Sequence, residues 1–319
     1  MHIQILIPTF NRTSDLIKNL KLLDGLISNE KNINVFEILV SENRATYESQ
    51  KEITLAIEKL SVNVKLYKHD ENIGGERNCI FLLKQATADF IMFVGDDDFL
   101  PANYLTYIFN TILNDKNSTA IIPGFSALYA DGRIEPARYA DFDEKKYPSN
   151  LTTILSISNF GHQLSGIVFK REKLFENYTK YESNRNLYPF IFFLAYNIKR
   201  GHSYYAPKYQ VLVSQGNSKD WNYDASGLLT DILRNYSILF PNSPIKRWLC
   251  GVSFISKQSW RLRAGKDLRA AWAAFSHLAR SEHVDLMMKL SLPFLYGYSY
   301  ARSTLGFVKR RVVRLIRQP

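Results

Sequence analysis

Short apolar runs alternate with segments of helical periodicity along the first hundred residues of the chain. Strands are predicted at residues 3–8, 35–41, 64–67 and 90–94, and helices at residues 15–27, 49–60 and 77–85. Strands that alternate with helices favour right-handed crossovers and a mainly parallel sheet with helices on both faces. The pattern therefore predicts an α/β fold.

Polar residues follow each of these predicted strands. Pro8 ends the first strand, residues 41–43 follow the second, a glycine turn at residues 72–78 follows the third, and an acidic triplet at residues 96–98 follows the fourth. The carboxyl ends of parallel strands meet at one edge of a sheet, where open α/β folds bind their ligands. We therefore expect these four segments to converge on one crevice.

The acidic triplet consists of Asp96, Asp97 and Asp98, directly behind a buried strand. Adjacent like charges repel, and a carboxylate near a buried strand end is costly without a partner. The sequence shows no arginine cluster close to the triplet. A divalent metal would supply the counter-charge, because Mg²⁺ and Mn²⁺ prefer oxygen ligands and Mg²⁺ combines one or two carboxylates with substrate phosphates. A solvated acidic turn is the alternative.

Beyond residue 118 the pattern is mixed and then becomes helical. A strand and a hairpin turn are predicted within residues 119–135, strands near 167–170, 203–206 and 211–214, an apolar helix at 190–198, and helices near 228–233, 248–263, 268–279 and 284–292. The change predicts two regions, an α/β domain at residues 1–220 and a helical region at residues 221–319.

Composition is consistent with a large folded domain and an appendage. The chain has 319 residues, of which 46% are hydrophobic and 13% aromatic, so it can bury a sizeable core. Cys79 and Cys250 form no disulfide framework or metal-binding spacing, which makes a reducing cytosol the default. The chain enters its first strand without the pattern of a signal peptide, so we expect no export.

Positive charge is concentrated at the carboxyl end. Residues 241–319 contain fifteen Lys and Arg against three acidic residues, whereas the whole chain has a net charge of +11. The rest of the chain is therefore close to neutral. This asymmetry indicates an anionic surface as partner.

The last segment reads as a basic amphipathic helix. Its apolar positions are Leu305, Val308, Val312 and Leu315, and its flanking basic positions are Arg302, Lys309, Arg310, Arg314 and Arg317. Residues 290–301 are apolar but contain Pro293 and fall short of the roughly 20 residues needed to span a bilayer. We expect residues 301–319 to lie on an anionic membrane surface. A helix that packs its apolar stripe on the protein is the alternative.

Four segments stand out together along the first hundred residues. They read ILIPTFNR at 5–12, FEILVSEN at 36–43, NIGGERN at 72–78 and VGDDDFL at 94–100. In this order and spacing they resemble the successive motifs of family 2 glycosyltransferases with the GT-A fold. The Gly-Asp-Asp-Asp variant is most similar to bacterial enzymes of O-antigen and capsule assembly, including the abequosyltransferase-like group. The resemblance weakens after residue 130 and is lost near residue 220. It implies a Rossmann-like GT-A domain followed by the C-terminal helical region.

The resemblance also implies roles for individual residues. The implied donor-binding residues are Pro8, Thr9, Asn11, Arg12, Glu42, Arg77, Asn78, Asp96 and Asp97. Thr9 and Arg12 would lie nearest the base and diphosphate, and Glu42 stands where relatives carry an Asp that hydrogen-bonds the pyrimidine. Asp98, with Asp96, is the expected ligand of Mn²⁺ or Mg²⁺, while Asp97 or Asp96 would hold the ribose or a metal-bound water. For Arg77 and Asn78, a salt bridge at the start of the helix is the alternative.

The catalytic base is the least defined part of the predicted site. The family inverts the anomeric centre by direct displacement, which requires a base for the acceptor hydroxyl. Relatives commonly carry Glu-Asp before a helix, and Glu182 is the nearest carboxylate here. His162 and Asp220 are the next candidates, and Asp97 belongs to the catalytic set. An ordinary hydrogen-bonded loop histidine is the alternative for His162.

These features predict an inverting, metal-dependent glycosyltransferase. It would move a hexosyl or deoxyhexosyl group from a UDP, CDP, GDP or TDP donor to a polyprenyl-diphosphate-linked oligosaccharide in bacterial surface polysaccharide synthesis. It would be peripheral on the cytoplasmic face of the inner membrane. One alternative is a nucleic-acid-binding protein that uses the basic tail, but the tail has no recognition motif and we expect no nucleic-acid partner. A non-catalytic glycan-binding protein is the other alternative.

Overall fold

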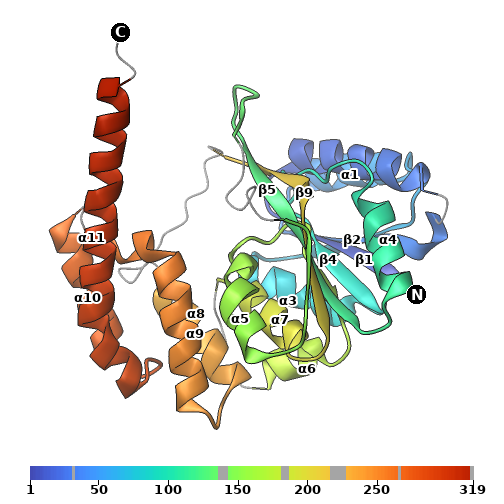
Figure 1. Ribbon diagram of the computed structural model, residues 1–319. Coiled ribbons are helices and arrows are strands. Elements are labelled where there is room, and N and C mark those ends of the chain that lie inside the picture. Colours follow the sequence, from blue (N-terminus) through green and yellow to red (C-terminus); the bar gives the residue numbers. More distant parts are fainter. Residues whose placement is uncertain (31–32, 136–142, 181–186, 216–227, 265–266, 317–319) are drawn as a thin grey trace.

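The computed structural model of the protein describes residues 1–30, 33–135, 143–180, 187–215, 228–264 and 267–316. Side chains are described in these ranges except for Ile33 and residues 306–316. The described part contains one nine-stranded sheet, and Figure 1 shows helices on both of its faces and a separate group of helices at the carboxyl end. This arrangement confirms the predicted α/β fold with a C-terminal helical region.

The first half of the sheet is parallel. Its elements are β1 (Ile3–Thr9), α1 (Thr13–Ser28), the 3-10 helix η1 (Ile33–Val35), β2 (Phe36–Asn43), α2 (Tyr47–Ile57), β3 (Val64–His69), α3 (Gly75–Gln85) and β4 (Phe90–Phe93). The strands lie in the order β3-β2-β1-β4, and each pairs in parallel with its neighbours. In α1 the apolar positions Leu16, Leu20, Leu23 and Ile27 are buried, as their helical spacing predicts.

The second half of the sheet is mixed. Its elements are α4 (Tyr104–Asn114), β5 (Ser118–Leu128), β6 (Ile134–Glu135), β7 (Lys145–Tyr147), α5 (Leu151–Ile157), the 3-10 helix η2 (Ser158–His162), β8 (Val168–Lys170), α6 (Leu174–Thr179), α7 (Pro189–Ile198) and β9 (His202–Ser214). Strand β8 is antiparallel to both β4 and β5, while β5 and β9 are parallel. The predicted hairpin is present, because β5 and β6 pair and the Gly132 amide donates to the Tyr129 carbonyl at 2.9 Å.

The two short strands predicted at 203–206 and 211–214 belong to one strand, β9. Its pairing with β5 shifts register between Pro123 and Gly124, whose partners are Ala206 and Gln210. A Cβ atom at Gly124 would lie 2.4 Å from the Pro207 carbonyl oxygen, so only glycine fits this close approach. The sequence pattern therefore detected the two paired halves of β9 and missed the irregular residues that join them.

Helix α7 is buried on nearly all sides and forms the centre of the core. Pro189 occupies its first turn, where the missing amide hydrogen costs nothing. Phe190 and Phe193 pack against Phe93 at the end of β4, with ring centroids 5.1 and 6.2 Å apart. This packing fixes the end of β4, from which the acidic triplet leaves the sheet.

The C-terminal helices pack on the α/β region through buried polar contacts as well as apolar ones. They are α8 (Leu229–Leu239), α9 (Pro244–Lys257), the 3-10 helix η3 (Ser259–Leu262), α10 (Leu268–Arg280) and α11 (Leu286–Ile316). The hydroxyl groups of Ser158 and Tyr236 lie 2.8 Å apart, and the Asn235 amide donates to the Tyr188 carbonyl at 3.0 Å. The predicted boundary at residue 220 lies outside the described residues.

Two predicted helix limits in this region are wrong. The helix predicted at 248–263 begins at Pro244, which is pre-organised for a first turn, and its end is the separate 3-10 helix η3. The helix predicted to end at Leu292 continues as α11, a single helix of 31 residues with Pro293 inside it. Within the described residues, no helix is both long enough and apolar enough to cross a membrane.

Candidate active site

A cavity of about 730 Å³ opens at the carboxyl ends of β1, β2 and β4. It lies at the edge of the sheet where the sequence predicts a ligand site. Its lining residues come from all parts of the fold, namely residues 8–10, 12, 43, 72, 74–76, 78–79, 95–98, 162–165, 187–190, 213–215, 260 and 261. The C-terminal helical region thus contributes to the wall of the cavity.

The three carboxylates of the acidic triplet are nearly inaccessible to solvent. Asp96, Asp97 and Asp98 are 4%, 3% and 7% exposed, and all three line the cavity. A solvated acidic turn is therefore excluded. Three carboxylates that are shielded from water in this way need compensating positive charge and hydrogen bonds.

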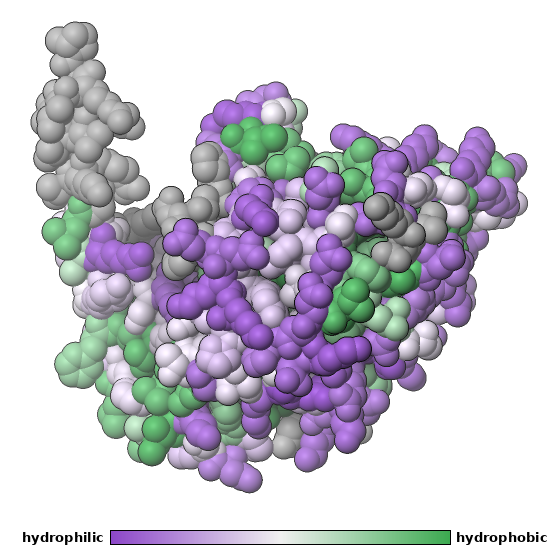
Figure 2. Space-filling view, turned by 45° about the vertical axis from the view of Figure 1, so that its right-hand side comes forward, coloured by the Kyte–Doolittle hydropathy of each residue, from purple (hydrophilic) through white to green (hydrophobic). Residues whose placement is uncertain are grey.

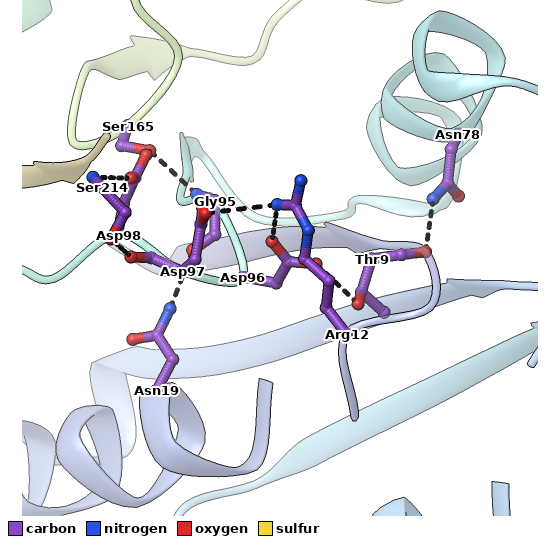
Figure 3. A network of polar contacts seen from close by, with 10 residues as sticks. All are labelled: Thr9, Arg12, Asn19, Asn78, Gly95, Asp96, Asp97, Asp98, Ser165 and Ser214. Atoms are coloured by element: carbon purple, nitrogen blue, oxygen red, sulfur yellow. Dashed lines mark hydrogen bonds and ion pairs between the residues drawn. The ribbon is translucent and has the colours of Figure 1, made fainter. Parts of the chain in front are cut away.

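Arg12 supplies positive charge to the triplet. Its Nη1 atom lies 2.9 Å from Asp96 Oδ1 and 3.3 Å from Asp97 Oδ2 (Figure 3). The sequence shows no arginine cluster beside the triplet, but folding brings the single residue Arg12 to it from 84 positions upstream. The resemblance placed Arg12 beside the donor diphosphate, and in the structure it faces the carboxylates.

Burial and pairing oppose each other at Asp96. Burial raises the pKa of Asp96, while Arg12 and the Thr9 hydroxyl, which donates to Asp96 Oδ2 at 2.8 Å, partly offset this effect. For Arg12, burial lowers the pKa, but attraction to Asp96 and Asp97 outweighs it and the net shift is upward. The contact with Arg12 therefore favours the charged form of Asp96, and burial disfavours it.

Asp98 is held by a different set of groups (Figure 3). The Ser165 hydroxyl donates to Asp98 Oδ2 and accepts from the Gly95 amide at 2.8 Å. The Ser214 amide donates to Asp98 Oδ1 at 3.0 Å. A Cβ atom at Gly95 would lie 2.8 Å from Asp98 Oδ2, so glycine at this position is required by the folded position of the carboxylate.

The first turn of α3 forms the opposite side of the cavity. Gly74 precedes it with φ of 85°, a backbone conformation that favours glycine, and no side chain caps the helix. Asn78 is buried and donates to the Ser41 carbonyl at 3.0 Å, while its Oδ1 atom has no partner within the described residues. The helix terminus has a partial positive charge, and its first amide groups are available to an anion.

The structure brings together most of the residues predicted for the donor site. Pro8, Thr9, Arg12, Asn78 and the three Asp residues all line the cavity. Asn11, Glu42 and Arg77 do not line it.

The three predicted residues outside the lining occupy different surroundings. Asn11 has φ of 52° in the turn after β1. Glu42 is 1% exposed and accepts from Gln50 Nε2 at 3.3 Å, and its Oε1 atom has no hydrogen-bond partner among the described residues. Burial raises the pKa of this carboxyl group. Arg77 is exposed on α3.

Among the predicted base candidates, only His162 and Asp97 fall within the described residues. Glu182 and Asp220 lie outside them. His162 lines the cavity, and its Nδ1 atom lies 2.6 Å from the Asn159 carbonyl oxygen. A carbonyl oxygen only accepts, so Nδ1 carries the hydrogen in this contact and Nε2 is the acceptor nitrogen of the neutral ring.

Several cavity residues could not be identified from the sequence. Ser165 and Ser214 have no motif of their own and act only through their positions beside the triplet. Trp260 and Arg261 come from η3, in the predicted helical region at residues 221–319, where the sequence indicated no site residue. The Arg261 guanidinium is 3% exposed, lies over the rings of Tyr188 and Trp260 at 4.9 and 4.6 Å, and donates to Gln258 Oε1 at 2.8 Å.

The donor atoms fit a metal that is shared with a ligand. In the described part of the chain, no three His, Cys, Asp or Glu side chains are grouped so as to hold a cation by themselves. Asp96 and Asp98 nevertheless present carboxylate groups at the cavity, and an ionised carboxylate has about four lone-pair sites that accept. Such a set suits Mg²⁺ or Mn²⁺ bound by one or two carboxylates and completed by substrate phosphates.

Two solved structures with a similar fold contain a bound nucleotide sugar. The chain resembles residues 1–349 of S. aureus TarS in complex with UDP-GlcNAc, with a TM-score of 0.68 and 17% identity over 95% of this chain and 88% of that one. It also resembles the mannosyltransferase PcManGT from Pyrobaculum calidifontis in complex with GDP-Man and Mn²⁺, with a TM-score of 0.57 and 15% identity over 95% and 83% of the two chains. At such identities the likeness establishes the GT-A fold alone.

Sequence comparison establishes the family. No curated protein matches the chain. The model of Glycosyl transferase family 2 matches residues 4–178, which is more than half of the chain. The match includes residues 4–9 of β1, α3 and the acidic triplet, all of which contribute to the lining of the cavity. The chain therefore belongs to glycosyl transferase family 2.

Proposed function

We propose that the protein is a metal-dependent, inverting glycosyltransferase that uses a nucleotide-diphosphate sugar. The observation that supports this most is the juxtaposition of buried Asp96–Asp98 with the uncapped start of α3 across one cavity. A nucleoside diphosphate carries negative charge that a helix N-terminus attracts and that carboxylates repel unless a cation lies between them. The cavity therefore suits a diphosphate together with a metal.

Asp98 and Asp96 would hold Mn²⁺ or Mg²⁺, and the bound metal would neutralise charge that develops on the leaving diphosphate. Ser165 and Ser214 position the Asp98 carboxylate before any ligand arrives. Asn78 Oδ1, buried and unpartnered among the described residues, offers an acceptor to a ribose or amide hydrogen of the donor. UDP and GDP sugars are the first donors to consider, since the TarS and PcManGT structures contain them.

Direct displacement requires a base beside the acceptor hydroxyl. His162 lies in the cavity wall with its Nδ1 hydrogen directed to the Asn159 carbonyl, which leaves Nε2 as the proton-accepting nitrogen. Among the described residues it is the base candidate whose tautomer the surroundings define. Glu182 remains a predicted alternative.

For the acceptor we propose a polyprenyl-diphosphate-linked oligosaccharide of bacterial surface polysaccharide synthesis, of the O-antigen or capsule type. This part rests on the motif resemblance and on the basic carboxyl end, with fifteen Lys and Arg against three acids in residues 241–319. An enzyme acting on such an acceptor would work as a peripheral protein on the cytoplasmic face of the inner membrane.

A donor-cleavage assay tests the proposal. The full chain is incubated with UDP-, CDP-, GDP- and TDP-sugars and a short polyprenyl-diphosphate-linked saccharide, with and without Mn²⁺, and release of the nucleoside diphosphate is measured. We expect metal-dependent release from at least one donor and its loss in Asp98→Asn, which keeps the size of the side chain and one of its two acceptor oxygens. Asp70→Asn, at an exposed position, is the matched control. Full activity in Asp98→Asn, or glycan binding with no release from any donor, would refute the catalytic assignment.

A further inference from the structure

Helices α10 and α11 present large apolar side chains to solvent. We call this surface the outer face, defined by Leu268 and Trp272 of α10 and Leu286, Leu290, Phe294 and Leu305 of α11, which are 78%, 69%, 71%, 66%, 80% and 70% exposed. Figure 2 shows hydrophobic side chains gathered below the grey end of the chain, at the lower left. Apolar side chains grouped in this way on a soluble surface indicate an interaction site.

Packing within the chain does not account for the outer face. The opposite side of α11 is buried, with Met288, Leu292 and Leu295 at 2%, 0% and 6% exposure. An ordinary surface helix has one apolar stripe directed to the core and polar residues elsewhere. Helix α11 has a second apolar stripe at Leu286, Leu290 and Phe294, which follow one another at intervals of four residues.

Aromatic contacts connect α10 and α11 beside the outer face. The Trp272 ring stacks on Phe275 with centroids 5.6 Å apart, and Phe275 meets Tyr296 of α11 edge to face at 5.4 Å. These contacts join the two helices. Trp and Tyr side chains are favoured at the boundary between lipid and water, because their rings are apolar and their polar atoms remain hydrated.

The charge around the outer face identifies its partner. Helix α11 continues as backbone to Ile316, and its sequence after Leu305 contains four Lys and Arg and no acid up to that residue. A second copy of the chain docked on the same face would bring two such basic segments together, which is repulsive. We propose that the outer face of α10 and α11 inserts into the interfacial region of an anionic lipid bilayer.

This surface differs from the attachment predicted at residues 301–319. It begins at Leu268, and its stripe on α11 from Leu286 to Leu305 is about 28 Å long at the helical rise of about 1.5 Å per residue. A helix with such a stripe lies in the plane of the membrane with its apolar side chains below the headgroups. In this arrangement the outer face supplies apolar insertion, and the basic end of α11 supplies attraction to anionic lipid.

Contacts connect the outer face to the cavity. The Ser299 hydroxyl of α11 donates to the Ser259 carbonyl of η3 at 2.8 Å, and the Arg302 Nη1 atom donates to the Ser256 carbonyl of α9 at 2.8 Å. The next residue of η3, Trp260, lines the cavity. If α11 binds lipid, the wall of the cavity that contains Trp260 is therefore attached by hydrogen bonds to the helix that contacts the membrane. The insertion does not depend on the proposed reaction.

Vesicle flotation tests the proposal with the full chain. The vesicles contain phosphatidylcholine with 30% phosphatidylglycerol, or phosphatidylcholine alone. The double variant Leu290→Ser/Phe294→Ser removes two side chains of the outer face, and we expect its affinity for the anionic vesicles to fall by roughly tenfold or more. The control is Leu22→Ser/Leu113→Ser, at leucines 48% and 53% exposed on α1 and α4, which we expect to bind as the wild type does. Equal binding by the two double variants would overturn the proposal.

Fluorescence quenching by brominated lipid provides a second test that does not depend on folding of the double variant. Trp272→Phe should remove most of the emission that the brominated lipid quenches. Trp248→Phe should leave this quenching unchanged, because the Trp248 indole donates a hydrogen bond to Ser291 Oγ at 2.8 Å within the protein. Quenching that survives in Trp272→Phe contradicts insertion of the outer face. Sedimentation of the wild type completes the test, because an oligomer that Leu290→Ser/Phe294→Ser converts to a monomer would identify a second copy as the occupant.

Discussion

Arg12 and Asp96 form an ion pair of 2.9 Å between the first and fourth strands of the sheet, and Arg12 also lies 3.3 Å from Asp97. The Asp96 side chain is 6% exposed and the Arg12 side chain 29%. The pair has two consequences. It supplies positive charge to the acidic triplet from within the chain. It also connects the turn after β1 to the turn after β4, and residues of both turns line the cavity.

Replacement of Arg12 by Gln should lower the free energy of unfolding at pH 7 by about 1–3 kcal/mol, because it leaves buried carboxylates without their cation. The loss should shrink as the pH falls from 7 toward 5. Burial already raises the pKa of Asp96, and removal of Arg12 raises it further. As the pH falls, Asp96 therefore binds a proton in the folded variant at a higher pH than in the unfolded chain, and this protonation removes the uncompensated charge.

Denaturant titrations at several pH values measure this difference. Arg133→Gln is the control, because Arg133 is 56% exposed and pairs with Glu135 at the surface. A variant at Arg12 as stable as the control at pH 7 would show that the ion pair has no such role.

Gly95→Ala should damage the site without unfolding the protein. The new Cβ atom would lie 2.8 Å from Asp98 Oδ2 and 3.4 Å from Ser165 Oγ, so the carboxylate must move away from both of its donors. We expect metal-dependent turnover to fall by about tenfold or more, since displacement of a group that binds metal is costly to catalysis. Gly25→Ala is the matched control, because its Cβ would meet nothing within 4 Å in the last turn of α1. That control should gain about 0.5–1 kcal/mol of stability.

Neighbouring positions on α3 should respond differently. Asn78 is 2% exposed and lines the cavity, whereas Arg77 is exposed and does not. We expect Asn78→Ala to weaken nucleotide binding by roughly tenfold, in line with loss of one or two hydrogen bonds in a buried site. Arg77→Ala should leave binding within about twofold. Calorimetric titration of both variants decides the matter, and a larger loss at Arg77 would favour the role that the family resemblance implies for it.

A chain that ends at Leu305 should separate the two contributions to membrane binding. It lacks the basic residues from Lys309 onward and keeps the described outer face. We expect weaker binding to anionic vesicles and a smaller effect of salt, because interfacial charges are screened over about 10 Å at 0.1 M ionic strength. Binding that is unchanged in strength and in salt dependence would assign no role to the tail.

The sequence predicts the first half of the fold well because each signal there is local. The apolar run at Phe90–Phe93 predicts a buried strand, and the spacing of Leu16 and Leu20 predicts the buried face of α1. Each prediction uses only the residues of the element itself. The continuation of α11 through Pro293 is not local, because tertiary packing of Leu292 and Leu295 offsets the cost of proline.

The site is predicted in part for the same reason. The acidic triplet has a recognisable pattern, whereas Arg12 reaches it only through a contact across 84 positions. Ser165, Ser214 and Arg261 have ordinary local sequences and become site residues by topology alone. Hydrophobic periodicity cannot reveal a contact that depends on strand order, and the antiparallel placement of β8 brings Ser165 to the triplet.

The central claim is that the cavity binds a nucleoside diphosphate together with a divalent metal. Thermal unfolding of the wild type with UDP, CDP, GDP and TDP, each with and without Mn²⁺, tests it most directly, because a ligand of the folded state stabilises it by about 2.7 kcal/mol at a hundred times its Kd. We predict that at least one nucleotide raises the Tm only when metal is present, and that Asp98→Asn abolishes the shift. No shift with any nucleotide and either Mn²⁺ or Mg²⁺, or an equal shift in Asp98→Asn, would contradict the account.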